Sequence, residues 1–397
     1  MIRQNFNADW MVEKGDGNSR MNSFLGNTQT KTVHLPYDAM IHEARTPDTK
    51  NGAQTGFYPG GEYIFQKHFT APQAWQGKPV SLVFEGVYQT ALVYLNGWLL
   101  TRNVNGYAEF TVEAGPYLKY GADNLLKVIA DNSLEPNSRW YTGSGIYRPV
   151  RLLVGNKVYL PQDTVRITTR EADEGFALLD VTAQVQSAST VTERVTLQQT
   201  ICREGTAVLT DRQNLLLQPG ESRTVSFRYC VDSPALWSPE NPNLYTSTMQ
   251  VLEGEEELDR EETGFGIRTL SIDASHGVRI NGQTVKLRGA CIHHDNGILG
   301  AATLPDAEER RIRQLKEAGF NAIRSSHHPA GRALLDACDR YGVLVMDELS
   351  DVWNVRKNPY DYALYFEQDW KPTIQKMVAK DYNHPSVILY CVGNEIS

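Results

Sequence analysis

The stretch NAIRSSHHPAGRALLDACDRYGVLVMDE, residues 321–348, contains a strand, a helix and a second strand in immediate succession. Residues 321–326 and 343–348 have the length of short buried strands. Residues 331–342 between them have the length and apolar spacing of a helix and end on a glycine, a common helix stop. Two strands joined by a helix predict a parallel pair, because parallel strands need a long crossover connection.

The same alternation continues on both sides of this stretch. The helix predicted at 305–320 has Ile312, Leu315 and Ala318 along one face. With the other elements it predicts the first half of a (β/α)8 TIM barrel, which we assign to residues 271–397. Those other elements are a strand at 284–292, a helix around 367–382 and a strand at 386–392.

The first two thirds of the chain predict two β-sandwiches. Residues 1–155 alternate apolar and polar residues between turn signals, which favours a sandwich or jelly roll. Within it Asn96-Gly97 is the dipeptide of a type I′ hairpin, because both residues tolerate a positive φ. Residues 156–270 are again strand-like, with a turn at Pro219-Gly220, and have the length of an immunoglobulin-like sandwich.

Composition excludes several classes of partner. The net charge is −8 and Lys and Arg form no cluster, which argues against nucleic-acid binding. No apolar run is long enough to span a bilayer, so we expect no membrane partner. The N-terminal segment has no apolar signal region, and this predicts a cytoplasmic protein.

The cysteines carry no metal or disulfide pattern. There are five of them, widely scattered and without CxxC spacing, so we expect buried free thiols in a reducing compartment. They are Cys202, Cys230, Cys291, Cys338 and Cys391.

Chemically active residues follow the predicted barrel strands. The four strands are followed in turn by CIHHDNG, SSHHP, DELSDVWN and GNEIS. Histidines, carboxylates, an amide and a tryptophan therefore gather at the C-terminal rim, where barrel enzymes place their active sites.

Two chemistries compete for these residues. A metal-dependent hydrolase would use His and Asp as ligands, but the histidines come as adjacent pairs, 293–294 and 327–328. Neighbours on an extended strand point to opposite faces, so each pair offers one ligand to a common centre. Glycoside hydrolysis instead needs two carboxylates, one of them a general acid, and Glu395 beside Asn394 is a candidate for that acid.

Motifs in all three regions resemble glycoside hydrolase family 2, the family of β-galactosidases, β-glucuronidases and β-mannosidases. The resemblance covers nearly the whole chain, and the last motif is the most specific. The motifs are LVFEGVYQTALVYLNGWLL and SRWYTGSGIYRPVRL in the first region, LWSPENPNLYTSTMQV and GFGIRTL in the second, and INGQTVKLRGACIHHDNGILGAA, GFNAIRSSHHP, CDRYGVLVMDE and DYNHPSVILYCVGNEIS in the third.

The resemblance implies a role for the last motif. Glu395 matches the general acid/base, which protonates the leaving oxygen and then activates water. Asn394 matches the residue that contacts the sugar 2-hydroxyl. His293 and His327 match histidines that line the sugar pocket, and Asp295 is expected to join them.

Other positions keep two interpretations. Trp353 is either a platform beneath the sugar ring or a core residue below the rim. Arg139 stands where other branches carry an acidic residue that reaches the pocket, and it could equally tie the first domain to the barrel by a salt bridge. His294 and His328 favour a structural role, and Asp347 and Glu348 are expected to orient their neighbours.

The chain departs from the family pattern at two places. It has HLPYDAM, residues 34–40, where the family often has LPHDW. After the third strand DELSDVWNV lacks the Glu-x-His that binds magnesium in one branch, so no metal and no cofactor are implied.

Together these features predict a retaining exo-β-glycosidase, with β-galactosidase as the first choice and a β-glucuronide as the alternative substrate. A carbohydrate substrate is implied, and a homo-oligomer stays open. The family's nucleophile lies on a later barrel strand, so we expect this chain to be a fragment that holds the acid/base alone. The other function class is a catalytically silent carbohydrate-binding or assembly module.

The fragment hypothesis makes a direct prediction. The chain alone should not hydrolyse an aryl β-galactoside, because retaining hydrolysis needs a second carboxylate about 5 Å from the acid. Appreciable release of the aryl group in that assay would contradict it.

Overall fold

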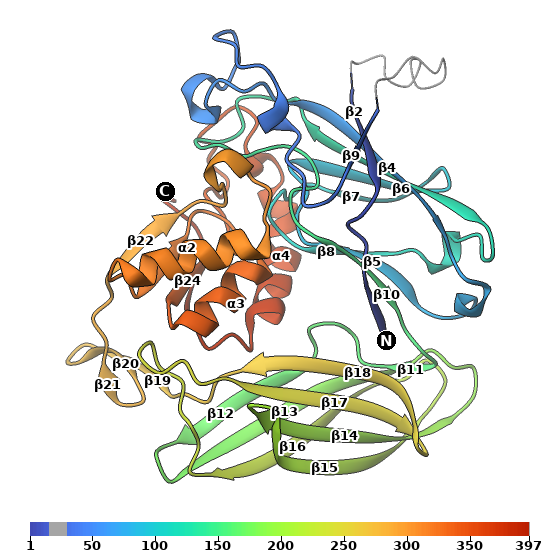
Figure 1. Cartoon of the computed structure of the whole chain (residues 1–397), viewed down its shortest axis with the longest axis vertical. Coiled ribbons are helices and arrows are strands. Elements are labelled where there is room, and N and C mark those ends of the chain that lie inside the picture. Colours follow the sequence, from blue (N-terminus) through green and yellow to red (C-terminus); the bar gives the residue numbers. More distant parts are fainter. Residues whose placement is uncertain (16–29, 397) are drawn as a thin grey trace.

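The computed structural model describes residues 1–15 and 30–396. It contains two β-sandwiches and a parallel sheet covered by helices, so the predicted fold class is confirmed (Figure 1). The parallel sheet with its helices, called the half barrel below, lies beside the first sandwich and above the second in this view. Ser397, the last residue of the final motif, lies outside the described residues.

The first sandwich consists of a six-stranded sheet, β3-β2-β4-β9-β6-β7, packed on a four-stranded sheet, β1-β10-β5-β8. Apolar side chains from both sheets meet in one core, for example Phe65, Leu126 and Leu82. Asn96 and Gly97 both have positive φ, 53° and 89°, between paired strands, which confirms the predicted hairpin. The strands are β1 Ile2–Asn5, β2 Trp10–Lys14, β3 Lys31–Val33, β4 Gly61–Thr70, β5 Val80–Phe84, β6 Thr90–Leu95, β7 Trp98–Asn103, β8 Phe110–Glu113, β9 Asp123–Asn132 and β10 Val150–Val154.

The second sandwich is built from long antiparallel strands. One sheet has the order β11-β13-β12 with β16 also paired to β13, and the other has the order β15-β14-β17-β18. The predicted turn at Pro219-Gly220 joins β15 to β16, and Gly220 has a φ of 70°. The strands are β11 Val158–Tyr159, β12 Arg166–Ala172, β13 Phe176–Ser187, β14 Glu193–Arg203, β15 Thr206–Leu217, β16 Ser222–Asp232, β17 Tyr245–Glu253 and β18 Glu256–Phe265.

The half barrel has four parallel strands in sequence order, β22-β23-β24-β25. Because all four run the same way, their C-terminal ends form a single rim. The elements are β22 Gly289–Ile292, α2 Pro305–Glu317, β23 Ala322–Ser325, α3 Arg332–Tyr341, β24 Leu344–Glu348, α4 Phe366–Asp381 and β25 Val387–Cys391. Short 3-10 helices complete the chain: η1 Met40–His42, η2 Gly52–Thr55, η3 Gln73–Trp75, η4 Gly115–Tyr117, η5 Gly297–Leu299 and η6 Tyr362–Leu364.

One predicted strand and two predicted burials were wrong. The segment 284–292 does not form one strand, because its start belongs to a separate antiparallel sheet made of β19 Leu270–Asp273, β20 Gly277–Ile280 and β21 Gln283–Thr284. All five cysteines are free, but Cys230 and Cys291 are exposed. Cys230 points outward from an alternating strand, and Cys291 lies on an edge strand of the half barrel.

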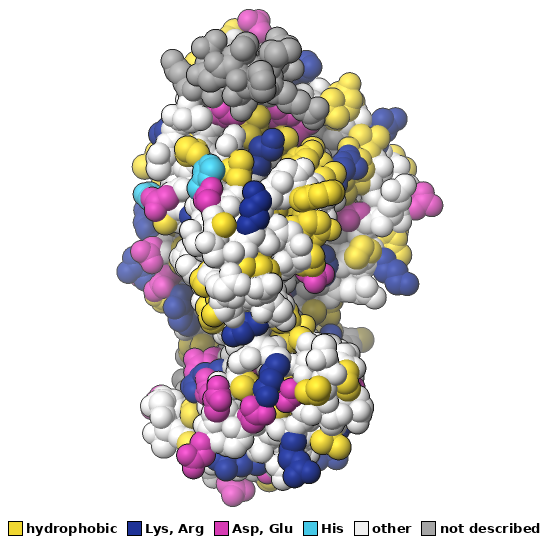
Figure 2. Space-filling model, turned by 90° about the vertical axis from the view of Figure 1, so that its right-hand side faces the viewer, with side chains coloured by type: hydrophobic (Ala, Val, Ile, Leu, Met, Phe, Trp, Pro, Cys, Tyr) yellow, Lys and Arg dark blue, Asp and Glu magenta, His cyan; other side chains and the backbone are white. Residues whose placement is uncertain are grey.

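No helix among residues 1–15 and 30–396 is long and apolar enough to cross a bilayer. Figure 2 shows the face on the right-hand side of Figure 1, where acidic and basic side chains are interspersed.

The half barrel is joined to the second sandwich by buried donors. Trp237, which is fully buried, donates from Nε1 to the carbonyl oxygen of Asp339 at 3.0 Å. Arg268 donates to the carbonyl oxygens of Pro385 and Val387, at 2.6 and 2.8 Å. Since these acceptors flank the start of β25, the second sandwich fixes the position of the last strand.

Arg332, at the start of α3, joins all three parts of the chain. Its guanidinium binds both carboxylate oxygens of Glu109 from the first sandwich, each at 2.8 Å, and Asp163 at 2.6 Å. Burial alone would raise the pKa of Glu109, but the charge and hydrogen bonds of Arg332 lower it to about 2. In this largely buried place Glu109 is also paired with Arg151 at 3.1 Å, whereas Arg332 is the cation that binds Asp163 among the described residues.

We predict that Arg332→Met lowers the free energy of unfolding by about 2–4 kcal/mol, because it leaves Asp163 without a cation and Glu109 with Arg151 alone. The matched control is Arg340→Met on the same helix, whose partner Glu309 is exposed and whose loss should cost less than about 1 kcal/mol. Urea unfolding followed by tryptophan fluorescence measures both. Equal losses in the two variants would contradict the assigned role of Arg332.

Candidate active site

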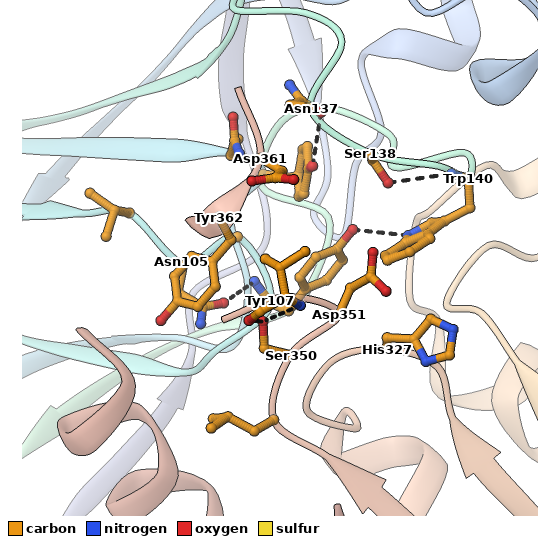
Figure 3. A pocket seen from close by; sticks show the side chains of 16 residues that line it. Asn105, Tyr107, Asn137, Ser138, Trp140, His327, Ser350, Asp351, Asp361 and Tyr362 are labelled. Atoms are coloured by element: carbon orange, nitrogen blue, oxygen red, sulfur yellow. Dashed lines mark hydrogen bonds between the residues drawn. The ribbon is translucent and has the colours of Figure 1, made fainter. Parts of the chain in front are cut away.

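The predicted site residues converge at the rim of the half barrel. They come from the ends of β22, β23, β24 and β25 and from one loop of the first sandwich, residues 138–141. A pocket between the two parts is lined by Trp140, His327 and Asp351 together with polar residues of the first sandwich (Figure 3). The first sandwich thus forms one wall of the candidate site.

Glu395 stands at the tip of β25 with a positive φ of 46°. Its side chain is 67% exposed, and its Oε2 lies 3.3 Å from Arg139 and 3.5 Å from Lys357. Both ion pairs use the same oxygen, and among the described residues nothing binds Oε1. Glu395 therefore has one oxygen beside two cations and the other without a partner among the described residues.

Asn394 is buried and held on both sides of its amide. Its Oδ1 accepts a hydrogen bond from Arg324 at 3.1 Å, and its Nδ2 donates to Asp351 at 2.9 Å. The carbonyl oxygen of Asn394 also accepts from Lys357 at 2.8 Å. These contacts orient the motif that carries Glu395.

Asp351, in the loop after β24, is bound by three side chains of the site. It accepts from Arg139 at 2.7 and 3.2 Å, from Lys357 at 3.0 Å and from Asn394. Burial would raise the pKa of Asp351, but these hydrogen bonds, led by that from Arg139, lower it. Arg139 therefore joins the first sandwich to the barrel, and it does so inside the candidate site.

Glu348, at the end of β24, is fully buried behind the rim. Arg324 binds both of its oxygens, at 3.0 and 2.6 Å, and His327 lies 2.9 Å away through Nδ1. Burial would raise the pKa of Glu348, but hydrogen bonds from His327 and Arg324 lower it. Both oxygens of Glu348 are therefore engaged by side chains of β23 and of the loop that follows it.

Each adjacent histidine pair divides between two sides of the rim. The ring of His293 stacks on Trp140 with centroids 4.8 Å apart, and its Nδ1 lies 2.7 Å from the carbonyl oxygen of Ser326. Burial lowers the pKa of His293. Asp295 is half-buried in the same loop, and its charge opposes that shift.

His294 and His328 point away from the rim into a buried aromatic cluster. His328 stacks on Tyr107 at 4.2 Å, and Nε2 of His294 donates to the carbonyl oxygen of Thr142 at 2.9 Å. Burial lowers the pKa of His294 to about 3 and that of His328 well below its usual value. Both histidines are neutral structural groups.

Trp353 lies at the edge of the rim and is 38% exposed, so it is no core residue. Its Nε1 donates to the carbonyl oxygen of Val392 at 2.8 Å, two residues before Asn394. Phe366 stacks on one face of the indole at 6.0 Å. An exposed indole fixed to the segment before Asn394 has the form of an aromatic platform for a sugar.

One cluster of three possible metal ligands, Asp336, Asp339 and His384, occurs among the described residues. It lies on α3 and before β25, away from the rim. Asp339 is already used by His384 at 2.6 Å and by the backbone N–H of Ser386 at 3.0 Å. The cluster is explained as a cap on the start of β25.

Sequence reasoning missed the partners of the predicted residues. Arg324 could have been found, because an arginine inside a short buried strand needs a carboxylate partner. Trp140, Asp351 and Lys357 carry no such signal. Their significance depends on contacts between segments far apart in the chain, such as Arg139 with Asp351.

The buried histidines predict a pH dependence of stability. His294 has a folded pKa of about 3 against 6.5 in the unfolded chain, so its stabilising contribution is complete above pH 6.5 and is lost as pH falls toward 3. Between pH 6.5 and 5, His294→Phe should reduce the slope of unfolding free energy against pH by about 1.4 kcal/mol per unit.

The control is His34→Phe, at an exposed position, which we expect to keep the native pH dependence. Urea unfolding at a series of pH values measures both slopes. An unchanged slope in His294→Phe would show that His294 is not neutral in the folded chain.

Three family models match this chain. Glycosyl hydrolase 2 galactose-binding domain-like matches residues 10–176, Glycosyl hydrolases family 2 matches 158–268, and Glycosyl hydrolases family 2, TIM barrel domain matches 273–397. The three matches agree with the two sandwiches and the half barrel.

Curated relatives match along almost the whole chain. Beta-galactosidase BoGH2A of Bacteroides ovatus is 37% identical over 395 residues, 99% of this chain and 46% of the relative. A putative beta-glucuronidase of Formosa agariphila is 32% identical over 396 residues, 99% of this chain and 37% of the relative. The chain thus spans less than half the length of these two relatives.

Solved structures agree. A glycosyl hydrolase family 2 member from Bacteroides cellulosilyticus superposes with a TM-score of 0.96 at 37% identity, covering 100% of this chain and 52% of that one. A beta-glycosidase from Bacteroides vulgatus gives a TM-score of 0.92 at 31% identity, covering 100% and 51%. With matches to all three of its regions, this chain belongs to glycoside hydrolase family 2.

Proposed function

We propose that this chain carries the acid/base part of a retaining exo-β-glycosidase that removes terminal β-linked sugars. The observation that carries the proposal is the arrangement around Glu395, a rim carboxylate with one oxygen paired to cations and the other open. The open Oε1 leaves room for the leaving oxygen of the substrate and later for a water molecule, as an acid/base requires.

Double displacement also needs a nucleophilic carboxylate about 5 Å from the acid. Glu348 and Asp351 are the neighbouring candidates among the described residues, and both are already bound by two or more donors. Carboxylates held in this way are poor nucleophiles, because their charge is neutralised in the resting state. We therefore expect the nucleophile on a further barrel strand, outside this chain.

The remaining rim residues are proposed to bind the sugar. His293 and His327 each have Nδ1 engaged, which leaves Nε2 for a sugar hydroxyl. Asn394 is proposed to contact the 2-hydroxyl and Asp295 a neighbouring one. Trp353 is proposed as the platform beneath the ring, where its exposed indole meets apolar C–H groups.

Arg139 is proposed to fix the positions of Asp351 and Glu395, and not to bind a charged group of the substrate. Its guanidinium is shared between Asp351 and Glu395. Arg139 can therefore be both a residue of the site and a salt bridge between the first sandwich and the half barrel, because this salt bridge lies at the site.

A neutral sugar suits this site better than a uronic acid. The three rim cations, Arg139, Arg324 and Lys357, are each paired with a carboxylate of the chain. Among the described residues, none of these three cations is left unpaired to meet the further negative charge of a glucuronide. We therefore propose a β-galactoside as substrate, in line with the Bacteroides ovatus relative, and keep a β-glucuronide as second candidate because the Formosa agariphila relative bears that name.

The test needs a complete barrel, and a chimaera supplies it. This chain would replace the matching part of the Bacteroides ovatus enzyme, and hydrolysis of nitrophenyl β-galactoside and β-glucuronide would be compared. We expect the galactoside to be the better substrate. Glu395→Ala should lower kcat on a poor leaving group by at least about 100-fold, because proton donation contributes that much.

Rescue by azide tests whether Glu395 is the acid/base. With a dinitrophenyl substrate, whose leaving group needs no proton, azide should restore turnover of Glu395→Ala and yield a β-glycosyl azide. No comparable rescue is expected for Asp351→Ala, which should act by loosening Asn394 and Arg139. If azide rescued Asp351→Ala but not Glu395→Ala, the acid/base would be Asp351, and the role proposed here for Glu395 would be wrong.

Assembly and location stay predictions. A homo-oligomer and a cytoplasmic location are both compatible with this fold, and sedimentation and fractionation of the expressed protein test them directly.

A further inference from the structure

Two aromatic side chains of the first sandwich contact all four histidines of the barrel rim. Trp140 stacks on His293 at 4.8 Å with 16° between the rings, and it meets His327 edge to face at 5.7 Å. Tyr107 stacks on His328 at 4.2 Å with 12° between the rings, and it meets His294 edge to face at 5.1 Å. Trp140 therefore contacts the two histidines that face the candidate site, and Tyr107 contacts the two that face the buried aromatic cluster.

The two aromatic residues are also joined to each other. Nε1 of Trp140 donates to the hydroxyl oxygen of Tyr107 at 3.1 Å, a bond drawn in Figure 3. The backbone around Tyr107 is fixed as well, because the Asn105 side chain accepts its N–H at 3.0 Å and Arg148 donates to its carbonyl oxygen at 2.7 Å. Trp140 is thus attached to a rigid support.

We propose that Tyr107 and Trp140, named here the aromatic clamp, are positioning residues that orient the imidazoles of His293 and His327 and keep water from one face of His293. The proposal rests on the proposed function for its catalytic meaning. The clamp comes from a different part of the chain than the histidines it holds. If the clamp acts in this way, sugar recognition by the barrel depends on residues of the first sandwich.

The geometry shows why a clamp is needed. Each rim histidine makes a single hydrogen bond through Nδ1, His293 to the carbonyl oxygen of Ser326 and His327 to Glu348. One bond leaves the ring free to rotate about it, because the torsion between the ring and its Cβ is broad. A stacked or edge-on aromatic ring removes that freedom. The two contacts together fix the direction of Nε2.

The clamp also has a consequence for the proton. Because a carbonyl oxygen can only accept, Nδ1 of His293 must carry its hydrogen, and Nε2 of the neutral ring is then an acceptor. Protonation would turn Nε2 into a donor and reverse its hydrogen bond to a sugar hydroxyl. Burial, to which Trp140 contributes one face, lowers the pKa of His293 and so opposes that reversal.

Other charges around His293 act in both directions. Asp295 from its own loop and Asp351 from the loop after β24 favour the protonated ring, whereas His327 disfavours it. Arg311 of α2 donates to the carbonyl oxygen of His293 at 2.7 Å. Because the nearby carboxylates pull the pKa upward, loss of the clamp should let it rise.

The experiment is a titration of the histidine Cε1 protons by NMR between pH 5 and 8, on this chain. His293 is assigned as the signal that is missing in His293→Gln. In the native chain we expect it to titrate below 6.5. In Trp140→Ala its midpoint should rise by about half a unit or more, and in Trp140→Phe, which keeps a ring against His293, it should stay near the native value.

Trp98→Ala is the control, because Trp98 is the most exposed tryptophan of the first sandwich and lies at the β6–β7 hairpin. It should leave the His293 titration unchanged. An unchanged or lowered midpoint in folded Trp140→Ala would overturn the proposal. If Trp140→Ala does not fold, the native chain still decides, since a native His293 that titrates at 6.5 or above would equally refute it.

The catalytic meaning is tested separately in the chimaera described above. Trp140→Ala should raise KM for the galactoside about tenfold, the cost of one misplaced hydrogen bond, with a smaller change in kcat. Trp140→Phe should recover most of the affinity. An inactive native chimaera would count against the proposed function alone, because the NMR result does not require turnover.

Discussion

Asp38 is the buried group on which the candidate site depends. Its carboxylate accepts hydrogen bonds from the hydroxyl of Tyr141 and from the backbone N–H groups of Met40, Ser144 and Ala301, at 2.6 to 3.0 Å. Three segments are thereby held at one point: η1, the loop after Trp140, and the barrel segment before α2. Burial raises the pKa of Asp38, while these hydrogen bonds oppose the rise.

The approach around Asp38 is so close that two glycines are required. A Cβ on Gly300 would lie 2.2 Å from the Asp38 carboxylate, and a Cβ on Gly143 would lie 2.5 Å from the Cβ of Ala301. Both residues also have positive φ, 60° and 67°. The loop that brings Arg139 and Trp140 to the rim can therefore reach the barrel only because these positions carry no side chain.

Charge at the rim is balanced in pairs. Arg324 neutralises Glu348, while Arg139 and Lys357 share Asp351 and the exposed Glu395. A site with matched charges can hold several ionised groups close together in a partly buried space, because each is compensated locally. Such a site leaves hydroxyl-specific contacts, from Asn394, His293 and His327, as the means of recognising a neutral sugar.

The local sequence determined the elements of this protein. Periodicity and glycine stops predicted α2, α3 and α4, and the Asn96-Gly97 and Pro219-Gly220 turns were found where expected, because these signals act over a few residues. The start of the first barrel strand was placed wrongly, since Gln283 and Thr284 pair with a neighbouring hairpin that no local signal announces. The adjacent histidines were predicted to face opposite ways, and they do so although they lie just after β22 and β23 and not within these strands.

Tertiary structure alone decided what those residues meet. The sequence placed Glu395, Asn394, His293 and His327 at one rim, because parallel strands bring their ends together. It could not show that Arg139 would reach Asp351, 212 positions away, or that Trp140 would stack on His293. Contacts of this kind depend on how two separately folded parts dock, and docking is set by buried groups such as Asp38 and Arg332, whose partners are distant in the chain.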